Sequence, residues 1–345
     1  MKVSKKVNAA RRSLMRGLTK NVGKSHSASI VQKNIPIKKI LISRPNHRLG
    51  NLLLLSPLVQ EVMETFPDAK IDLFVKGGVT PVIYKNYRNI DKIIQLPKKP
   101  FSSLFQYIKG WATLKSRKYD LVINASYGSS SGKLSTSMAR AEYRVFGDTD
   151  EKLQAKFSDY RHAAKNSIYS LRDFLSHLNI DRSNAKIPDL DIKLSDSEIE
   201  EGKVKLYDLV KNDKKSICLF TNATGAKCYS EEWWNSFYDK LETAFPNYNI
   251  VELLPVENIS KINFRAPSFY SKDIREMGGF ITNCKVFIAA DNGVMHLASA
   301  VNTSTVGLFM VTEEDVYKPY NEGSFAINTN EHSADEIINL LKNIL

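Results

Sequence analysis

The stretch RPNHRLGNLLLLSPLVQEVMETFPDAKIDLF, residues 44–74, decides the fold prediction for this chain. It follows the apolar run ILIS and predicts a strand, a short polar loop, a helix and a second strand. The loop ends in Leu49-Gly50-Asn51, and a glycine that opens a helix after a strand usually brings backbone N–H groups close to a ligand. We therefore predict a βαβ unit with a ligand site at its first turn, where the uncharged Asn51 stands.

From residue 38 onward, β-branched apolar runs alternate with helical patterns in two series, which is typical of parallel βαβ units. The predicted strands are 39–43, 70–75, 92–96, 120–124, 143–146, 216–221, 249–254, 286–289 and 305–309. The predicted helices are 52–65, 102–116, 131–140, 166–178, 231–244, 272–283, 293–300 and 334–344. Residues 187–194 are polar, include a proline and predict a linker between the two series.

The two series predict an α/β protein with two doubly wound parallel sheets. We expect an N-terminal segment at 1–34, a first Rossmann-like domain at 35–190 and a second at 191–345. Ligands of such folds bind outside the carboxyl ends of the strands, so a cleft between the two domains is the expected site.

Composition narrows the class of protein. The chain has 345 residues, of which 43% are hydrophobic and 25% are charged, as in soluble globular proteins. Its three cysteines, Cys218, Cys228 and Cys284, are far apart and have no metal-ligand spacing, which indicates reduced thiols in a cytosolic protein. No apolar run approaches the length of a membrane span.

The net charge of +12 comes from one end of the chain. Residues 1–39 contain eleven basic and no acidic side chains, which leaves 38 basic against 37 acidic side chains in the other 306 residues. A nucleic-acid-binding protein would carry basic residues across its folded surface, so we do not expect a nucleic-acid partner. Residues 1–34 have apolar residues at helical spacing, and they fit either a cationic amphipathic helix on an anionic membrane or a solvated disordered tail.

Two loops of the second series suggest an anion site. The loop TNATGAKCYSEEWW, residues 221–234, contains Lys227 and a good N-cap, Ser230. In DNGVMHLASA, residues 291–300, Asp291-Asn292-Gly293 opens a helix whose N–H groups would face the same cleft. The alternative is an ordinary N-cap at Asp291, a packed core histidine at His296 and a solvated lysine.

The segments RPNHRLGNLLLLSPLVQEVMETFPDAKIDLFVKGG, residues 44–78, and FIAADNGVMHLASAVNTSTVGLFMVT, residues 287–312, resemble the two signature regions of the heptosyltransferase family, glycosyltransferase family 9. The resemblance implies a GT-B fold and inverting transfer of a heptose from ADP-heptose to the inner core of lipopolysaccharide. It also implies that the enzyme needs no metal and no cofactor, and that it lies on the cytoplasmic face of the inner membrane.

The resemblance implies a donor site in the second domain. Lys227 matches the lysine that neutralises the diphosphate, and Thr224 matches a hydroxyl beside it. The second signature, whose amides hold the phosphates, and a more weakly matched ribose-binding carboxylate add the residues Asp291, Asn292, Gly293, Val294, His296 and Glu257.

The acceptor side departs from the family. The first signature normally ends in Gly-Asp with the aspartate as general base, but here Asn51 follows Gly50, and Asn124 stands where many members have aspartate. An amide cannot accept the proton, so His47 is the leading candidate base, with a packed or capping histidine as the alternative. Basic candidates for the acceptor site are Arg44, Arg48, Lys133, Arg140 and Arg144.

The sequence also bears on two other classes of function. A nicotinamide-dependent oxidoreductase would need G-x-G-x-x-G after the first strand, which LGNLLLL lacks. A catalytically weak or inactive family member that acts as a binding or scaffold subunit in envelope polysaccharide synthesis remains the alternative, because of Asn51 and Asn124.

Overall fold

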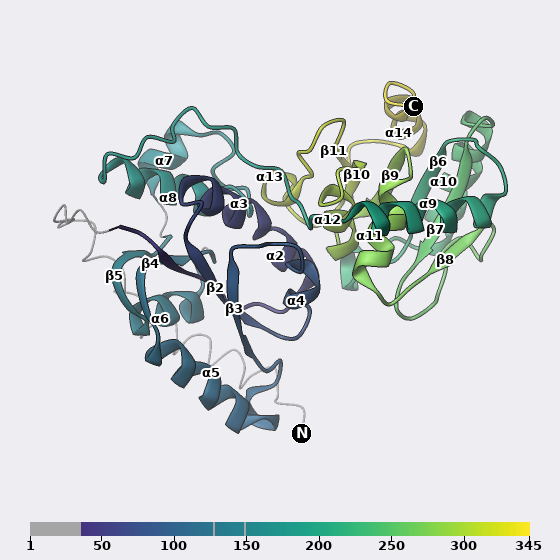
Figure 1. The fold of residues 1–345 in the computed structure, drawn as a ribbon. Helices are drawn as coiled ribbons and strands as arrows, with labels where there is room; N and C mark the ends of the chain where they lie inside the picture. The colour runs from purple at the N-terminus through teal and green to yellow at the C-terminus, as the bar shows by residue number, and fades with distance from the viewer. Residues whose placement is uncertain (1–35, 127, 148–149) are drawn as a thin grey trace. The chain divides into compact units, whose positions relative to one another are not determined.

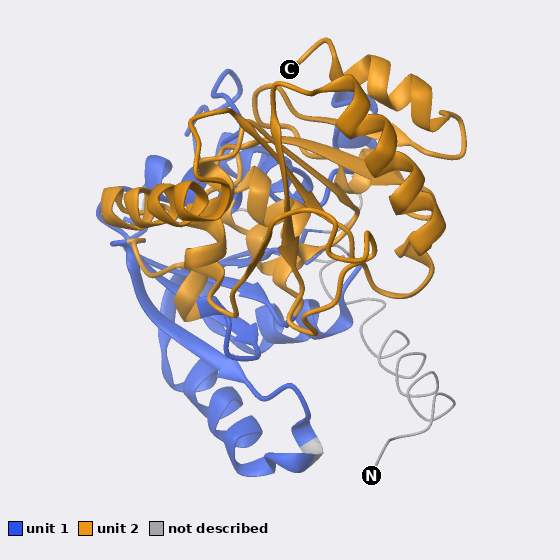
Figure 2. Cartoon of the chain, turned by 90° about the vertical axis from the view of Figure 1, so that its right-hand side faces the viewer, with its two compact units in different colours: residues 1–47, 57–80, 88–188 blue, residues 48–56, 81–87, 189–345 orange. Residues whose placement is uncertain are grey.

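The computed structural model describes residues 36–126, 128–147 and 150–345, which divide into two compact units. Within the described part, unit 1 holds residues 36–47, 57–80 and 88–188, and unit 2 holds 48–56, 81–87 and 189–345 (Figure 2). The predicted N-terminal segment at 1–34 lies outside the described residues. Each unit contains one parallel sheet covered by helices (Figure 1).

Unit 1 is built on a five-stranded sheet of order β3-β2-β1-β4-β5, in which every pairing is parallel. Its strands are β1 (Lys39–Arg44), β2 (Lys70–Lys76), β3 (Ile90–Leu96), β4 (Lys118–Asn124) and β5 (Arg140–Val145). Its helices are α3 (Ser56–Thr65), η1 (Pro100–Ser102), α5 (Leu104–Ser116), α6 (Ser130–Met138), α7 (Glu151–Lys156) and α8 (Asn166–Ser176). The central strands are buried on both faces, as the apolar runs predicted.

Helices cover both faces of this sheet. Trp111 of α5 packs edge-on against Phe74 of β2, with ring centroids 5.1 Å apart. On the opposite face, Phe174 of α8 packs against Tyr143 of β5 at 5.6 Å. Successive residues of a strand point to opposite faces, and the strand register places Phe74 and Tyr143 on different ones. An ion pair from Arg172 of α8 to the buried Glu61 of α3, 2.7 Å long, joins α8 to α3.

Unit 2 repeats the plan with a six-stranded parallel sheet of order β11-β10-β9-β6-β7-β8. Its strands are β6 (Ser216–Phe220), β7 (Asn249–Leu254), β8 (Ser268–Tyr270), β9 (Val286–Ala290), β10 (Ser304–Phe309) and β11 (Phe325–Asn328). Its helices are α2 (Leu49–Leu53), α4 (Thr80–Ile83, mostly in this unit), α9 (Asp196–Val210), η2 (Gly225–Lys227), α10 (Glu231–Ala244), α11 (Ile274–Thr282), α12 (Gly293–Ser299), α13 (Glu314–Tyr317) and α14 (Ala334–Leu341). From the first strand of the unit, β6, the order reverses between β6 and β9, as in a Rossmann-like sheet.

The core of unit 2 lies on one face of its sheet and is rich in aromatic residues. Val306 and Leu308 of β10 join Trp234 and Phe237 of α10 in one buried cluster, to which α14 contributes as well. Gly307, between these two residues of β10, faces the opposite side of the sheet. A Cβ added there would lie 2.8 Å from the sulfur of Met295 on α12. The α10 and α14 helices therefore cover one face, and α12 covers the other.

One of the predicted helices was wrong. The helix expected at 52–65 is two helices, α2 and α3, because Pro57 lacks an N–H and its ring would clash with the carbonyl of Leu53 in a continuous helix. The Ser56 hydroxyl donates to that carbonyl at 2.8 Å instead. The elements that we did not predict are α4, α7, α9, α13, β8 and β11.

The remaining predicted strands and helices are present, with ends within a few residues of those expected. The longest element missed, α9, begins with a capping box formed by Ser195 and Glu198. Within the ranges that the structure describes, no helix has the length and apolar character of a membrane span.

Candidate functional site

An ion pair between Lys227 and Asp291 joins two of the predicted loops of unit 2. Lys227 ends η2 after β6, and Asp291 follows the last residue of β9, so both lie at the carboxyl edge of the sheet. Lys227 Nζ contacts Asp291 Oδ2, and the Thr312 hydroxyl donates to the same oxygen at 2.6 Å. Asp291 is buried, whereas the Lys227 side chain is 34% exposed. A lysine ammonium has three N–H donors, so one of them can hold Asp291 while others face an incoming anion.

His296 and Tyr317 complete this cluster. His296 Nε2 lies 3.9 Å from Asp291 Oδ1, and its side chain is 5% exposed. The Tyr317 ring lies 5.8 Å from Lys227 Nζ and 6.3 Å from the imidazole centroid. Lys227, Asp291 and His296 are thus brought together as the sequence predicted for one anion site. Thr312 and Tyr317 were missed, although Thr312 follows β10 and the rule about carboxyl ends of strands applies to it as well.

Asn292, and not Asp291, is the N-cap of α12. Its side-chain oxygen accepts hydrogen bonds from the N–H groups of Val294 at 2.7 Å and Met295 at 2.9 Å. The alternative that Asp291 is an ordinary N-cap is therefore wrong. The cap also occupies the Val294 amide that we expected to hold a phosphate. The Asn292 amide donates to the Asn222 carbonyl at 3.2 Å, which ties this turn to the loop that carries Lys227.

The two other predicted donor residues lie outside the cluster. Thr224 and Glu257 are exposed in the loops after β6 and β7, and within the described chain neither side chain forms a hydrogen bond or ion pair. A carboxylate that the sequence reasoning missed, Glu252 of β7, is fully buried. Burial raises the pKa of Glu252, and the hydrogen bonds from Ser260 and Thr221 oppose this rise. The Thr221 hydroxyl donates to Glu252 at 2.6 Å. Its only sequence signal was a charge inside the apolar run NIVELL.

The helix with the Gly-Asn turn, α2, packs on α12 inside unit 2. A Cβ on Gly50 would lie 2.7 Å from His296 Cδ2, and a Cβ on Gly293 would lie 3.1 Å from the Leu49 Cβ. The half-buried Asn51 follows Gly50 on α2. Asn51 is therefore built into the same unit as the Lys227–Asp291 pair, although it precedes residue 190. His47 is exposed and belongs to unit 1. A Cβ added to Gly77 of the same unit would lie 3.1 Å from the Cβ of His47.

Three predicted acceptor residues hold backbone in unit 1. Arg44 is buried and donates from Nη1 to the Ala125 carbonyl at 2.5 Å. Asn124 is 1% exposed, and its amide donates to the Phe146 carbonyl at 2.7 Å, which joins the carboxyl ends of β4 and β5. Arg144 donates to the Ala139 carbonyl at 2.8 Å and so caps the end of α6. These contacts give all three side chains a structural role.

The predicted helix at 131–140 included Arg140, and this placement was wrong. Arg140 begins β5, so it lies at the amino edge of the parallel sheet and not at the carboxyl edge. Arg48 is the exposed residue before α2, and Lys133 is half-buried on α6. Of the five basic candidates, Arg48 and Lys133 are the two that neither begin a strand nor hold the backbone contacts described above.

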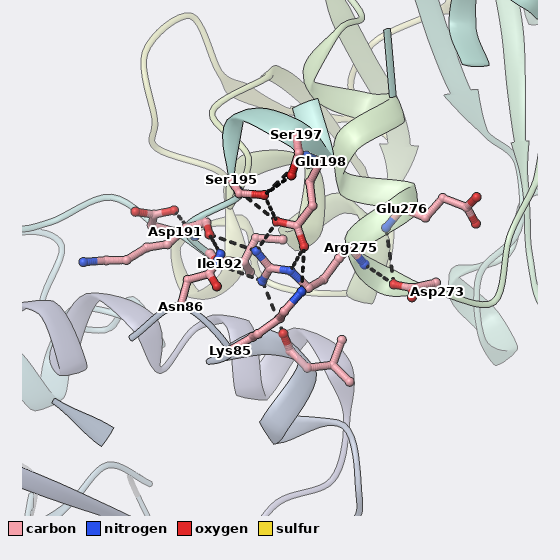
Figure 3. A network of polar contacts seen from close by, with 12 residues as sticks. Lys85, Asn86, Asp191, Ile192, Ser195, Ser197, Glu198, Asp273, Arg275 and Glu276 are labelled. Atoms are coloured by element: carbon pink, nitrogen blue, oxygen red, sulfur yellow. Dashed lines mark hydrogen bonds and ion pairs between the residues drawn. The ribbon is translucent and has the colours of Figure 1, made fainter. Parts of the chain in front are cut away.

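A buried arginine that we did not predict holds the segment of unit 2 that begins at residue 189 (Figure 3). Arg275 of α11 donates from Nε and Nη2 to the two carboxylate oxygens of Glu198 on α9, at 2.5 and 2.6 Å. It also donates to the carbonyls of Ile192 at 2.9 Å, Lys193 at 2.8 Å and Val82 at 3.3 Å. The Arg275 hydrogen bonds lower the pKa of Glu198 to about 2, although burial opposes this. The segment after residue 188 is thereby anchored to α9 and α11.

Comparisons with known proteins agree with this fold. The family model described as glycosyltransferase family 9 (heptosyltransferase) matches residues 271–339. The chain is 21% identical over 297 residues to lipopolysaccharide heptosyltransferase 3 of Escherichia coli, an alignment that covers 79% of this chain and 84% of that protein.

Solved structures show the same likeness. A family 9 glycosyl transferase from Veillonella parvula superposes with a TM-score of 0.68 at 17% identity, over 90% of this chain and 91% of that one. The E. coli heptosyltransferase WaaC with ADP superposes with a TM-score of 0.65 at 15% identity, over 89% of this chain and all of that one.

Two Rossmann-like parallel-sheet units, of which the second carries a cluster of polar side chains at the carboxyl edge of its sheet, define the GT-B fold. The chain is similar to the heptosyltransferases of glycosyltransferase family 9.

Proposed function

We propose that the protein transfers a sugar, a heptose, from ADP-heptose to the lipopolysaccharide inner core or a related glycolipid, with inversion and without a metal. The Lys227–Asp291 pair carries the proposal, because it holds an ammonium group at the carboxyl edge of a Rossmann-like sheet. The names of relatives support the donor and acceptor: one is lipopolysaccharide heptosyltransferase 3, and another structure holds WaaC with ADP-2-deoxy-2-fluoro heptose.

In the proposed reaction, an acceptor hydroxyl oxygen forms a bond to the anomeric carbon of the donor sugar from the face opposite the nucleotide. The bond from that carbon to the diphosphate oxygen breaks, and its electron pair leaves with ADP. Lys227 stabilises the negative charge that develops on the diphosphate, and Asp291 holds the lysine in place for this role. Thr224 and the backbone at Gly293 would contact the phosphates, and Glu257 the ribose.

The acceptor side needs a group that takes the hydroxyl proton. We propose that Asn51 orients the acceptor hydroxyl through its amide and that His47 accepts the proton, because an unperturbed histidine titrates near neutral pH. Arg48 and Lys133 are the proposed contacts to acidic groups of the acceptor. Residues 1–34 are proposed to hold the protein at the cytoplasmic face of the inner membrane, because all their charged side chains are basic.

Calorimetric titration of the full chain with ADP-heptose tests the donor site. We expect Lys227→Ala to weaken binding about tenfold or more, since a charge-assisted contact is worth about 1.5–3 kcal/mol. Asp291→Ala should also weaken binding, because the lysine loses its positioning partner. Lys261→Ala is the matched control, because that lysine also forms an ion pair in unit 2, 3.0 Å from Glu231.

Unchanged affinity in both site variants would show that the donor does not bind at this pair. The catalytically weak or inactive scaffold is the second candidate, and Asn51 at the base position favours it. It predicts normal ADP-heptose binding with no transfer to any lipopolysaccharide acceptor, whereas the proposed enzyme shows both.

A further inference from the structure

Helix α5 of unit 1 has apolar side chains on two sides. Its inner side packs on the sheet through Trp111 against Phe74 and through the buried Leu114. Gly110 allows the helix to lie close to β3, since a Cβ there would be 2.6 Å from Leu96 Cδ2. These contacts bury one stripe of the helix and account for its position on unit 1.

The outer side of α5 is apolar as well. Leu104 is 57% exposed, Phe105 79% and Ile108 58%, and the three are neighbours on the helix surface at positions i, i+1 and i+4. A surface helix normally carries polar residues on its outer side, and a helix that is apolar all round is normally covered. Three large apolar side chains together on one exposed turn indicate a surface that another body covers.

The charged side chains of the segment that contains this helix are all basic. Residues 92–118 contain seven basic side chains and no acidic one. Arg117 is paired with Asp72 at 2.5 Å and with Asp91 at 2.7 Å. The other six are lysines that form no ion pair within the residues described here: Lys92, Lys98, Lys99, Lys109, Lys115 and Lys118. These lysines favour a negatively charged covering body.

A cavity of about 530 Å³ lies on another side of α5, where Gln106, Lys109, Gly110 and Thr113 line it. It is bounded by the carboxyl ends of β2 and β3 and by α5, and Lys92, Lys98 and Lys109 line it together with Gly77 and Gly78. The three lysines give this cavity a positive charge, which suits a phosphate group. Exposed apolar side chains on a segment whose lysines form no ion pair within the described residues match the two layers of a phospholipid monolayer, acyl chains and phosphates.

We propose that residues 97–116 dock on the surface of an anionic phospholipid bilayer. Leu104, Phe105 and Ile108 enter the boundary of the acyl chains, while the lysines of the segment stay at the level of the phosphates. The inference deepens the proposed function and rests on it for its biological purpose, because a glycolipid acceptor would lie in such a surface. Its test uses no donor and no acceptor, so it can fail without the proposed transfer failing.

Sedimentation of the full chain with vesicles tests the docking surface. The chain should bind vesicles of phosphatidylcholine with phosphatidylglycerol more tightly than vesicles of phosphatidylcholine alone. The variant Leu104→Ser, Phe105→Ser, Ile108→Ser should bind the anionic vesicles about tenfold or more weakly. Val204→Ser, Val256→Ser, Phe264→Ser is the matched control, since these unit 2 side chains are 52–62% exposed. Lys98→Gln with Lys109→Gln should reduce the preference for the anionic vesicles.

A local measurement separates α5 from the basic residues 1–34. In Phe105→Trp, vesicles whose acyl chains carry bromine should quench the added indole fluorescence. Ser176→Trp is the control, because Ser176 is exposed at the end of α8 on the opposite face of the same sheet. Equal binding by the triple variant, or vesicle-bound Phe105→Trp without quenching beyond that of Ser176→Trp, would overturn the proposal. Absence of binding to either vesicle would leave an acidic protein as the covering body and would overturn it too.

Discussion

The position of a Cβ on Gly50 lies 2.7 Å from Cδ2 of His296, although the two residues are 246 positions apart in the sequence. Real Cβ atoms do not approach another atom so closely, so glycine is required where α2 crosses α12. This contact holds the helix of Asn51 against His296, which lies beside the Lys227–Asp291 pair. The glycine of the first signature is therefore explained by packing between the two signature regions.

Gly50→Ala should destabilise the protein by about 1–3 kcal/mol, because the added methyl group must displace the buried imidazole or α2 itself. Thermal unfolding of unit 2 would measure the effect. In Gly78→Ala, a Cβ would meet no atom within 4 Å, so that variant should unfold like the natural protein. If His296 is the obstacle, Gly50→Ala should cost less in a His296→Ala background, and an equal cost in both backgrounds would contradict this explanation.

Asn124→Asp should destabilise unit 1 by about 1–3 kcal/mol near neutral pH. The Asn124 amide donates to the Phe146 carbonyl at 2.7 Å in a buried site. In Asn124→Asp, a carboxylate oxygen would face the carbonyl oxygen with no hydrogen between them. Burial would raise the pKa of the new carboxyl above its unfolded value, so the deficit should be small at low pH and grow as pH rises through the folded-state pKa. Asn258→Asp, at an exposed loop position, is the control. A deficit that does not change with pH would contradict the assignment of the amide as donor.

The rate of sugar transfer should depend on His47. If His47 is the base, kcat should fall as pH drops through its pKa, and His47→Gln should remove this dependence and lower kcat by roughly 10² or more. His177→Gln is the control, since His177 is an exposed histidine on the same unit. An unchanged pH–rate profile in His47→Gln would rule His47 out. A rate increase in Asn51→Asp would then identify Asn51 as the lost base position.

Acid should weaken unit 2 through Glu198. The Arg275 hydrogen bonds lower the pKa of Glu198 from 4.5 to about 2 in the folded state. A depressed carboxyl pKa stabilises the fold above the unfolded pKa, and this stabilisation is lost as pH falls from about 4.5 through about 2. Its size is on the order of 3 kcal/mol at most.

Thermal midpoints measured across that range test the contribution of Glu198. Glu198→Gln should lower the midpoint at neutral pH and flatten the acid dependence. Glu200→Gln changes a 66% exposed carboxyl of the same helix and should do neither. Identical acid dependence in Glu198→Gln and the natural protein would show that the pair with Arg275 does not control this transition.

The apolar runs of the sequence determined most of the strands, because a strand of a parallel sheet is buried on both faces and must be apolar along its length. The rule that ligands collect at carboxyl ends of strands also selected Lys227, Asp291 and His296 before any contact was known. Short edge strands such as β8 and β11 were not predicted, because three or four residues are too few to show a periodic pattern of apolar residues. The helix α9 escaped although its capping box is local, because its apolar side is narrow and interrupted by charges.

Only the tertiary structure decided which residues meet. Chain order placed Asn51 in the first domain, yet α2 packs on α12 because Gly50 and Gly293 let the two helices approach. The same holds for Arg144 and Asn124, whose polar groups hold carbonyls that parallel strands and helix ends leave at their carboxyl edge. The sequence gives the type of each side chain. Whether its polar group contacts a carbonyl, a carboxylate or a ligand depends on contacts between segments that are distant in the sequence. The exposed apolar side of α5 is of this kind, since its periodicity alone could not tell the inner stripe from the outer one.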